Sequence, residues 1–297
     1  MYLSIKTFSI VLLFGLVQLP RLQARVIHQE HSLYRNIIVT QNKNKRCMKF
    51  SFRRDRSQNQ SCLLVNKKKK LVFDYAKLST IGAVANPQAK KILIIGLGGG
   101  TLVKAYHDLM PQAQITTVEI DPAVVKVAKN YFYISPQPWS QIIAQDGRLF
   151  IKRALLKKQH FDIVVLDAFN GDYIPEHLMT REFFNEVKAI LTEQGIVVSN
   201  TFSGSHLYNN ESATYASVFG NFVELKGSFS GNRIILTTKT KPLQLKQLES
   251  NFVQYRQQMK DMDVKKSYLF NALNFEPEWN KKARILTDNY APVNILD

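Results

Sequence analysis

The stretch KILIIGLGGGTLVKAYHDLMPQAQITTVEID, residues 91–121, decides the fold. Its first part, KILIIG, is a continuous apolar run, which is typical of a strand buried on both faces of a parallel sheet. A glycine-rich turn, a segment with helical spacing and a second apolar run that ends in Glu119 follow it. A strand, a glycine loop, a helix and another strand in this order indicate an α/β fold with a doubly wound sheet.

The same alternation continues toward the C-terminus. We predict further strands over 140–147, 161–169, 195–202 and 232–239, and helices over 121–132, 147–158, 180–192 and 213–222. Asp121 and Thr180 are the expected caps of two of these helices, and Pro122 suits a first turn. We therefore assign residues 77–240 to a nucleoside-binding domain and residues 241–297 to a helical, polar tail that packs on it.

Residues 25–76 are expected to form a small N-terminal β domain. The β-rich runs are RNIIV (35–39), CMKFSF (47–52), CLLV (62–65) and LVFDY (71–75), and a helix is expected over 76–86. A hairpin centred near Arg54 and Asp55 would place Cys47 opposite Cys62. The pair then forms a disulfide, or remains two free, half-buried thiols. Two cysteines without a neighbouring His pair do not form a zinc site.

Composition excludes several classes of protein. With 297 residues, 45% hydrophobic and 21% charged, the chain is not disordered, collagen-like or a disulfide-dense scaffold. Lys+Arg 40 against Asp+Glu 23 gives a net charge of +17, and residues 1–75 hold 15 of these basic residues but only 3 acidic ones. This N-terminal excess predicts weak contact with a polyanion or an anionic membrane, or simply a solvated face.

The first 24 residues resemble a secretory signal or anchor. Lys6 precedes an apolar run over 7–17, which is shorter than the roughly 20 residues of a membrane-spanning helix. We expect export or membrane tethering through residues 1–24. The alternative is a buried N-terminal element of a cytoplasmic protein.

Four motifs carry chemistry. Gly96, Gly98 and Gly100 allow the backbone to approach a ligand at a helix N-terminus, and Glu119, roughly 20 residues later, suits ribose hydroxyls. Together they predict an adenosine-containing ligand. The Asp146 carboxylate would accept a hydrogen bond from an adenine amino group, and Gly147 would leave room for the adenine ring. In LDAFNGDYIP, residues 166–175, Asp167 would attract a cationic centre or an amine, while nearby His177 is expected to be structural.

Several segments together resemble one family. They are VEIDPAVVKVAKNYF, QDGRLFI, LDAFNGDYIPEHLMTREFF and LTDNYAPV, with SLYRNIIV and LVFDYAKL in the N-terminal part. The chain is similar over about residues 30–295 to the spermidine synthase-like, or polyamine aminopropyltransferase, group. The resemblance implies a small β domain before a Rossmann-like sheet of the S-adenosylmethionine-dependent type. It also implies aminopropyl transfer from decarboxylated S-adenosylmethionine to an amine such as putrescine, and a homodimer. No metal site is apparent in the sequence itself.

The resemblance also assigns roles to single residues. Gly96, Gly98 and Gly100 match the glycine loop of the family, and Glu119 matches the acid that binds ribose. Asp146 and Gly147 match the adenine contact. Asp167 matches the first acid of the active-site loop, and Tyr75 matches an aromatic residue that lines the amine groove. Tyr290, with Asp288, could close over that groove, but we favour a C-terminal segment that simply packs on the domain. Four positions depart from the family pattern: Arg35 and Ala76 replace glutamines, Gly99 replaces an acid that holds the donor's amine, and Asn170 replaces the catalytic acid.

Three functions remain open from the residues. The first is transfer of an aminopropyl group from a sulfonium donor to an amine, with Asp172 or Asp167 as the base; the four departures leave this transfer itself in question. The second is a methyltransferase that uses S-adenosylmethionine as co-substrate, with Arg35 pairing with its carboxylate if Arg35 faces the site. The third is a non-catalytic protein that binds adenosine-type ligands or polyanions.

Overall fold

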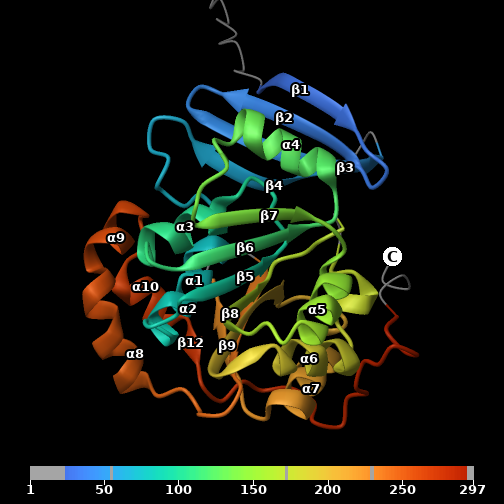
Figure 1. The fold of residues 1–297 in the computed structure, drawn as a ribbon, viewed down its shortest axis with the longest axis vertical. Coiled ribbons are helices and arrows are strands. Elements are labelled where there is room, and N and C mark those ends of the chain that lie inside the picture. The colour runs from blue at the N-terminus through green and yellow to red at the C-terminus, as the bar shows by residue number, and fades with distance from the viewer. Residues whose placement is uncertain (1–23, 54–55, 171–172, 228–230, 293–297) are drawn as a thin grey trace, which may run out of the picture.

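The computed structural model describes residues 24–53, 56–170, 173–227 and 231–292, and it contains two sheets (Figure 1). The small sheet contains β1 (Arg25–His31), β2 (Asn36–Asn42), β3 (Lys45–Arg53) and β4 (Arg56–Leu64), in the order β1-β2-β3-β4. The large sheet contains β5 (Lys91–Ile95), β6 (Gln114–Glu119), β7 (Ser140–Ala144), β8 (Phe161–Leu166), β9 (Leu191–Phe202), β10 (Val223–Lys226), β11 (Asn232–Thr238) and β12 (Leu273–Asn274).

The helices alternate with the strands of the large sheet. They are α1 (Asp74–Ser79), α2 (Ile81–Ala85), α3 (Thr101–Leu109), α4 (Pro122–Tyr131), α5 (Gly147–Leu156), α6 (Arg181–Ala189), α7 (Tyr208–Phe219), α8 (Leu245–Phe252), α9 (Arg256–Asp261) and α10 (Lys266–Asn271). Two 3₁₀ turns, η1 (Glu176–Leu178) and η2 (Val253–Tyr255), complete the set in the described part of the chain.

The strand order of the large sheet is β12-β10-β11-β9-β8-β5-β6-β7. Strands β9, β8, β5, β6 and β7 run parallel, whereas β11, β10 and β12 are added antiparallel at one edge. The predicted α/β fold with a doubly wound, Rossmann-like sheet behind a small β domain is therefore confirmed, with a mixed rather than all-parallel sheet.

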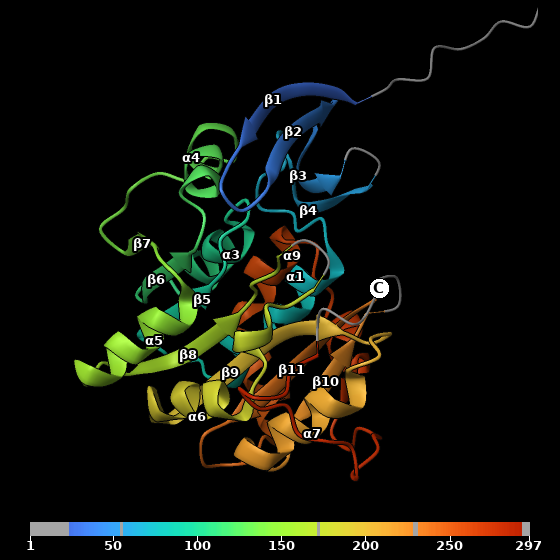
Figure 2. The same cartoon turned by 90° about the vertical axis from the view of Figure 1, so that its right-hand side faces the viewer.

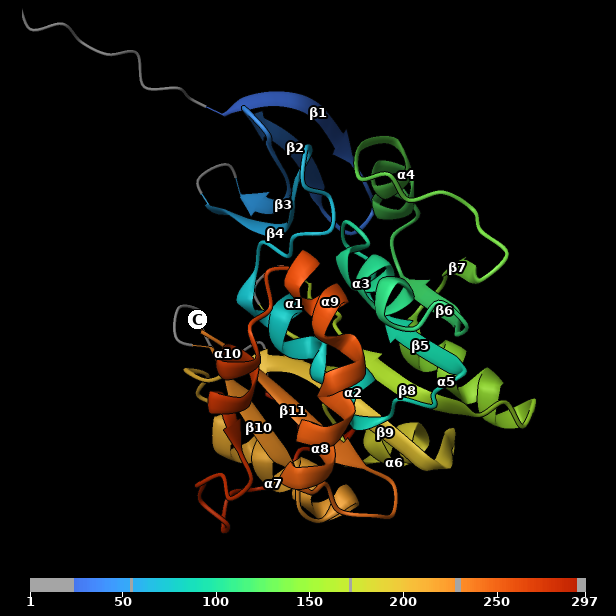
Figure 3. The ribbon, with the colours of Figure 1, turned by 90° about the vertical axis from the view of Figure 1, so that its left-hand side faces the viewer.

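Both faces of the large sheet are covered. Ile92 and Ile94 of β5 point into a core shared with α1–α3 and α8–α9, while Leu93 and Ile95 point into a second core under α5–α7. Figure 3 shows the first helical layer in front of the sheet, and Figure 1 shows α5–α7 on the other side. The two-residue alternation of side chains explains why β5 is apolar throughout.

The small sheet packs on α4. Ile37, Val39 and Met48 form a cluster with Val124 and Val127, and Figure 2 shows α4 beside the small sheet, above the large one. Asp121 caps α4 by accepting from the Ala123 amide at 2.9 Å, and Pro122 occupies the first turn. The predicted cap is confirmed, as is Thr180, which accepts from the Phe183 amide at 3.2 Å at the start of α6.

Cys47 and Cys62 form a disulfide. They are direct cross-strand partners of β3 and β4, and both side chains are buried. The predicted pairing is confirmed and the alternative of free thiols is wrong. The hairpin tip at residues 54–55 lies outside the described residues.

Replacing both cysteines by serine is expected to lower the free energy of unfolding by about 3 kcal/mol, because the bond closes a loop with a sequence separation of 15. Guanidinium unfolding of the oxidised wild type and of the C47S/C62S variant measures the difference. Adding a reductant to the wild type should reproduce the loss, and the double variant should not respond to the reductant. Equal midpoints for all four samples would show that the disulfide does not stabilise the fold.

Some predicted boundaries were wrong. The run 71–75 is not a strand: Leu71 donates its amide to Met262, and Asp74 and Tyr75 open α1. The expected helix over 76–86 is divided into α1 and α2 at Thr80, and Leu191 belongs to β9 instead of the preceding helix. The strands β1, β10 and β12 were not predicted. Strands β1 and β10 pair with the next strand in the chain, β2 and β11, whereas β12 pairs with β10, which is distant in the chain.

The four predicted domain ranges, 1–24, 25–76, 77–240 and 241–297, remain predictions. Residues 1–23 lie outside the described residues. In the described ranges no helix has both the length and the apolar character needed to cross a membrane.

Candidate active site

The carboxyl ends of five parallel strands meet at one edge of the large sheet. The glycine loop follows β5, Glu119 ends β6, Asp146 follows β7 and Asp167 follows β8, while Asn200 lies near the end of β9. These residues line a cavity of about 340 Å³. The small sheet covers its other side with Arg35, Phe50, Asn59, Gln60 and Ser61. Such an edge is where open α/β sheets bind their ligands.

The glycine loop is shaped by two close approaches. Gly96 has φ +100°, and a Cβ there would lie 2.2 Å from the carbonyl oxygen of Asp167. Gly100 has φ +69°, and a Cβ there would lie 2.2 Å from the Ile134 side chain. Gly96 and Gly98 line the cavity, while Gly100 shapes the loop from behind. Only glycine fits this backbone without displacing its neighbours.

Glu119 ties this loop to the next strand. Its Oε2 accepts from the Leu97 amide at 3.0 Å and its Oε1 accepts from the Asp121 amide at 3.1 Å. Burial raises the pKa of this carboxyl, against the opposing effect of the two backbone hydrogen bonds and of Arg35. The predicted ribose acid therefore lies in the cavity wall with its position fixed by backbone donors.

Arg35 faces the cavity from the loop between β1 and β2. Its Nη1 donates to the Phe169 carbonyl at 3.0 Å, its guanidinium lies 4.4 Å from the centre of the Phe50 ring, and its Nε lies 3.8 Å from Asp121 Oδ2. Burial lowers the pKa of Arg35, while the charges of Glu119 and Asp121 raise it. The positive charge is thus already opposed by two buried carboxylates.

Asp146 combines two contacts at the adenine end predicted for the cavity. One oxygen caps α5 by accepting from the Leu149 amide at 2.8 Å, and the other lies 2.9 Å from Nε2 of His177. The hydrogen bond with His177 is the main cause that lowers the pKa of Asp146. A Cβ at Gly147 would lie 2.5 Å from the Ile95 side chain, so this glycine allows α5 to pack closely on β5.

Asp167 follows β8 and lines the cavity. Asn200 Nδ2 donates to its Oδ1 at 2.9 Å. Burial raises the pKa of Asp167 to about 7, and the charge of Glu119 adds to this effect. Tyr75 of α1 lines the same cavity, and both burial and Asp167 raise the pKa of its phenol. A carboxyl poised near neutral pH in a buried cavity is suited to accept a proton.

Two predicted residues do not line the cavity. Asn170 is exposed and closes a turn: its Oδ1 accepts from the Tyr173 amide at 3.1 Å. Tyr290 lies 3.4 Å, ring centre to guanidinium, from Arg284 and packs on a small apolar cluster. Its partner Asp288 is bound instead by Arg148 at 2.7 Å and Thr180 at 2.6 Å. The C-terminal segment is therefore held by packing and by ion pairs, which is the alternative that the sequence favoured over closure of the groove. Asp172 lies outside the described residues.

Sequence reasoning missed several lining residues. They are Phe50, Ser61, Phe202, Asn200 and Asn232. The signal for Asn200 was present, because a polar side chain follows the apolar run of 196–198 at the edge where ligands bind. Ser61 and Phe50 gave no signal, since the packing of the small sheet brings them to the site.

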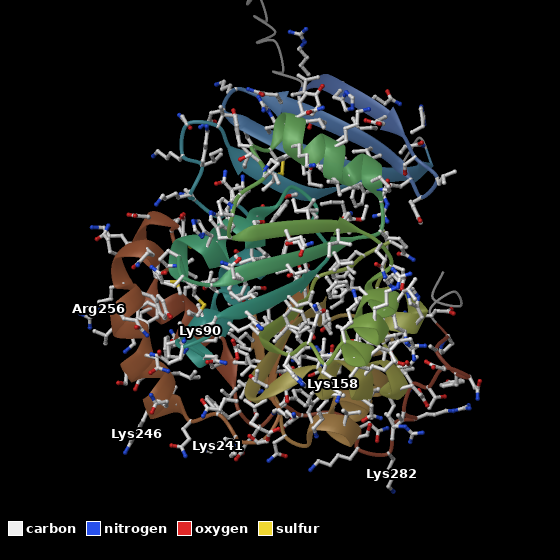
Figure 4. The ribbon with its side chains drawn as sticks, viewed as in Figure 1. Lys90, Lys158, Lys241, Lys246, Arg256 and Lys282 are labelled. Carbon is white, nitrogen blue, oxygen red and sulfur yellow. A yellow bond between two sulfur atoms is a disulfide. The ribbon has the colours of Figure 1, made fainter. Side chains whose placement is uncertain are left out.

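The cavity is acidic, in contrast to the chain as a whole. Among the described lining residues, Glu119, Asp146 and Asp167 are acids, and Arg35 and His177 are the basic side chains. Exposed basic residues occur also at the end opposite the small sheet, where Figure 4 labels Lys158, Lys241, Lys246 and Lys282. The predicted contact with polyanions or membranes remains a prediction. In the described ranges no cluster of three or more His, Cys, Asp or Glu could hold a metal ion.

Comparison with known proteins identifies the family in two ways. The spermine/spermidine synthase domain matches residues 74–230. A polyamine aminopropyltransferase of Vibrio vulnificus (strain CMCP6) is 40% identical over 276 residues, which cover 92% of this chain and 92% of that relative. The chain belongs to the spermine/spermidine synthase family. The predicted resemblance is confirmed.

Two solved structures share the fold of this family member. A probable spermidine synthase from Corynebacterium glutamicum ATCC 13032 matches with a TM-score of 0.63 at 20% identity, over 80% of this chain and 87% of that one. Human methyltransferase-like protein 13, solved in complex with SAH, matches with a TM-score of 0.55 at 21% identity. The match covers 74% of this chain and 96% of that one. These similarities concern the fold alone, so the fold does not choose between aminopropyl and methyl transfer.

One departure from the synthase pattern has a structural cause. A Cβ at Gly99 would lie 2.6 Å from Ser61 Oγ and 2.8 Å from the Phe132 ring. Ser61 in turn lies 3.1 Å, Oγ to Oγ1, from Thr101. The place that an acid takes in the family pattern is therefore filled by β4 and the residue after α4.

Introducing an acid at position 99 is expected to harm the protein. Gly99→Asp should lower the free energy of unfolding by about 2 kcal/mol, because the new side chain overpacks against Ser61 and Phe132. Urea unfolding measures this effect. Gly204→Asp is the matched control, since a Cβ at Gly204 meets nothing within 4 Å. A Gly99→Asp variant as stable as the control would mean that the loop can admit the family's acid.

Proposed function

We propose that this protein is a polyamine aminopropyltransferase, which moves an aminopropyl group from decarboxylated S-adenosylmethionine to an amine and releases methylthioadenosine. Membership of the spermine/spermidine synthase family and the 40% identity with an aminopropyltransferase over most of the chain support this reaction. The acceptor is a small amine, with putrescine as the first candidate. A homodimer, implied by the family resemblance, is part of the same proposal.

The charge of the cavity is the observation that carries the proposal. Decarboxylated S-adenosylmethionine is a dication, with a sulfonium and an ammonium group. Three of the described residues that line the cavity are acids, whose charges can balance those of the donor. S-adenosylmethionine adds a carboxylate, which needs a cation of its own. Arg35 does not supply one freely, because Asp121 and Glu119 already oppose its charge. The cavity therefore favours the decarboxylated donor over the intact one.

Asp167 is the base in this proposal. The acceptor nitrogen attacks the aminopropyl carbon that is bonded to sulfur. The bond between this carbon and sulfur breaks, and its electron pair leaves with methylthioadenosine. The proton released from the nitrogen passes to Asp167, whose pKa of about 7 allows it to accept the proton at neutral pH. Glu119 binds the ribose hydroxyls and Asp146 the adenine amino group, as the sequence predicted. Asp172, the alternative base, remains a prediction.

Turnover of the full chain tests the reaction. The protein is incubated with decarboxylated S-adenosylmethionine and, in turn, 1,3-diaminopropane, putrescine, cadaverine, spermidine and n-butylamine, and methylthioadenosine is measured by chromatography. We expect amine-dependent methylthioadenosine, and calorimetric binding of the decarboxylated donor at least tenfold tighter than that of S-adenosylmethionine. Production of S-adenosylhomocysteine from S-adenosylmethionine, without methylthioadenosine from the decarboxylated donor, would instead establish the methyltransferase.

Export is a separate part of the proposal. The buried disulfide between Cys47 and Cys62 supports it, because such bonds persist mainly in oxidising compartments. Fusion of residues 1–40 to alkaline phosphatase, a reporter that is active only after export, tests this. An active fusion is expected, and an inactive but stable fusion would place the protein in the cytoplasm.

A further inference from the structure

Two asparagines connect to Asp167 in a chain of hydrogen bonds. Asn200 Nδ2 donates to Asp167 Oδ1 at 2.9 Å, and Asn232 Nδ2 donates to Asn200 Oδ1 at 3.0 Å. All three side chains line the cavity. Asn200 is 4% exposed, so its amide contacts protein groups and not bulk water.

The position of the two asparagines follows from the sheet. Asn200 lies on β9, next to the strand that carries Asp167, and Asn232 begins β11, which pairs with β9 on its other side. Asn232 is opposite Phe202 in this register, two residues beyond Asn200, so both side chains lie on the same face. Three neighbouring strands thus present one amide–amide–carboxylate chain to the cavity.

The direction of these bonds distinguishes the two oxygens of Asp167. Oδ1 accepts from Asn200, whereas Oδ2 has no hydrogen-bond partner in the part of the chain that the structure describes. Asn200 in turn is held in one orientation, because its own oxygen accepts from Asn232. The carboxyl group is therefore held with one oxygen occupied and the other available.

We propose that Asn200 and Asn232 are positioning residues that orient Asp167 and keep its Oδ2 available to the acceptor amine. The role toward the amine rests on the proposed aminopropyl transfer, whereas the effect on Asp167 itself does not. Neither asparagine needs to touch the reacting atoms in this role.

The electrostatic surroundings of Asp167 make this bond consequential. Glu119 on β6 and the phenols of Tyr75 on α1 and Tyr106 on α3 are the titratable groups that interact with it. Burial and Glu119 raise the pKa of Asp167, and the bond from Asn200 is the effect that lowers it. Removing the donor should raise this pKa further, since a hydrogen bond to a carboxylate favours the charged form.

The first test is the pH profile of amine transfer by the full chain. In Asn200→Leu the acid limb of kcat/KM should move upward by about one pH unit. The resulting loss is about fivefold at pH 7, approaches tenfold below pH 6 and is recovered near pH 9. Asn232→Leu should move the acid limb in the same direction by a smaller amount. Asn200→Gln should move it less than Asn200→Leu does, because glutamine keeps an amide donor. Ser199→Ala, at a buried hydroxyl on the same strand, should leave the profile unchanged.

The second test does not need catalysis. The Asp167 carboxyl carbon, identified by comparison with Asp167→Asn, is titrated by ¹³C NMR in the ligand-free protein. The midpoint should lie near pH 7 in the wild type and about one unit higher in Asn200→Leu, with a smaller rise in Asn232→Leu. Unchanged midpoints in folded variants would overturn the proposal. A wild type that titrates as expected but transfers nothing would refute the proposed function and leave the asparagine chain intact.

Discussion

Asp167→Asn is expected to abolish aminopropyl transfer and, at the same time, to make the ligand-free protein more stable at pH 8. The loss of transfer should be about 10²–10⁴-fold, the usual contribution of a general base. Asn at this position keeps an oxygen that accepts from Asn200, so the local hydrogen bond survives. What disappears is the group that takes the proton and balances the positive charge of the donor.

The gain in stability follows from the raised pKa of Asp167. The pKa is about 7 in the folded protein and 3.8 ordinarily, so between pH 4 and 7 the folded state retains a proton that the unfolded chain loses. The contribution of Asp167 to stability therefore falls as the pH rises through this window, by at most about 4 kcal/mol in total. Asp167→Asn removes the charge, so it should recover part of this lost stability above pH 7 and almost none of it at pH 4.

Urea unfolding at pH 4, 6 and 8, together with methylthioadenosine release, measures both effects. Asp162→Asn is the matched control at the other end of β8, where the carboxylate accepts from Lys90, Lys91 and Thr192. That variant should be less stable at pH 8 and retain transfer. If Asp167→Asn transferred within tenfold of the wild type, Asp167 would not be the base. Equal stability at pH 8 would mean that burial does not penalise its charge.

Arg233→Met is expected to destabilise the fold by about 3–5 kcal/mol, because it leaves buried carboxylates without their cation. Arg233 is 0% exposed, and its guanidinium binds Glu211 at 2.7 Å, Ser212 at 2.8 Å and Thr201 at 2.9 Å. Glu224 lies 3.9 Å away and is also buried. Burial already raises the pKa of Glu211, and Arg233 is the main influence that lowers it.

The same network holds the active-site loop. The hydroxyl of Tyr173 donates to Glu211 and is hydrogen-bonded to Ser205, and Tyr173 closes the turn that contains Asn170. A change at Arg233 should therefore reduce transfer even where the protein remains folded. The loop also carries the Phe169 carbonyl that accepts from Arg35 in the cavity wall, so the effect should extend to the shape of the cavity.

Thermal and guanidinium unfolding measure the loss in Arg233→Met. Arg148→Met is the control, because Arg148 binds Glu186 and Asp288, whose side chains are 19% and 42% exposed and can be solvated. Arg148→Met should lower the free energy of unfolding by less than half as much as Arg233→Met. Adding Glu211→Gln and Glu224→Gln to Arg233→Met should restore part of the stability, since the unpaired charges are then removed. A single Arg233→Met variant as stable as Arg148→Met would contradict this account.

Local patterns in the sequence determined the architecture and many of the residues that line the cavity at the edge of the large sheet. The apolar run of 91–95 and the alternation that follows it predicted the parallel strands, because burial on both faces selects such runs. The positive φ angles of Gly96 and Gly100 and the caps Asp121 and Thr180 are decided within a few residues by backbone geometry. Glu119 and Asp146 were found because strand ends of a parallel sheet meet at one edge.

Tertiary structure alone decided the pKa shifts and the hydrogen bonds within the cavity. Asn200 lies 33 residues from Asp167, and Arg35 lies 134 residues from the Phe169 carbonyl that it binds. Ser61 fills the space beside Gly99, and Tyr290 packs outside the groove, through contacts that no local spacing records. Periodicity specifies which face of an element is buried, whereas the partner of a polar atom depends on how distant elements pack, and that packing exists only in the folded chain.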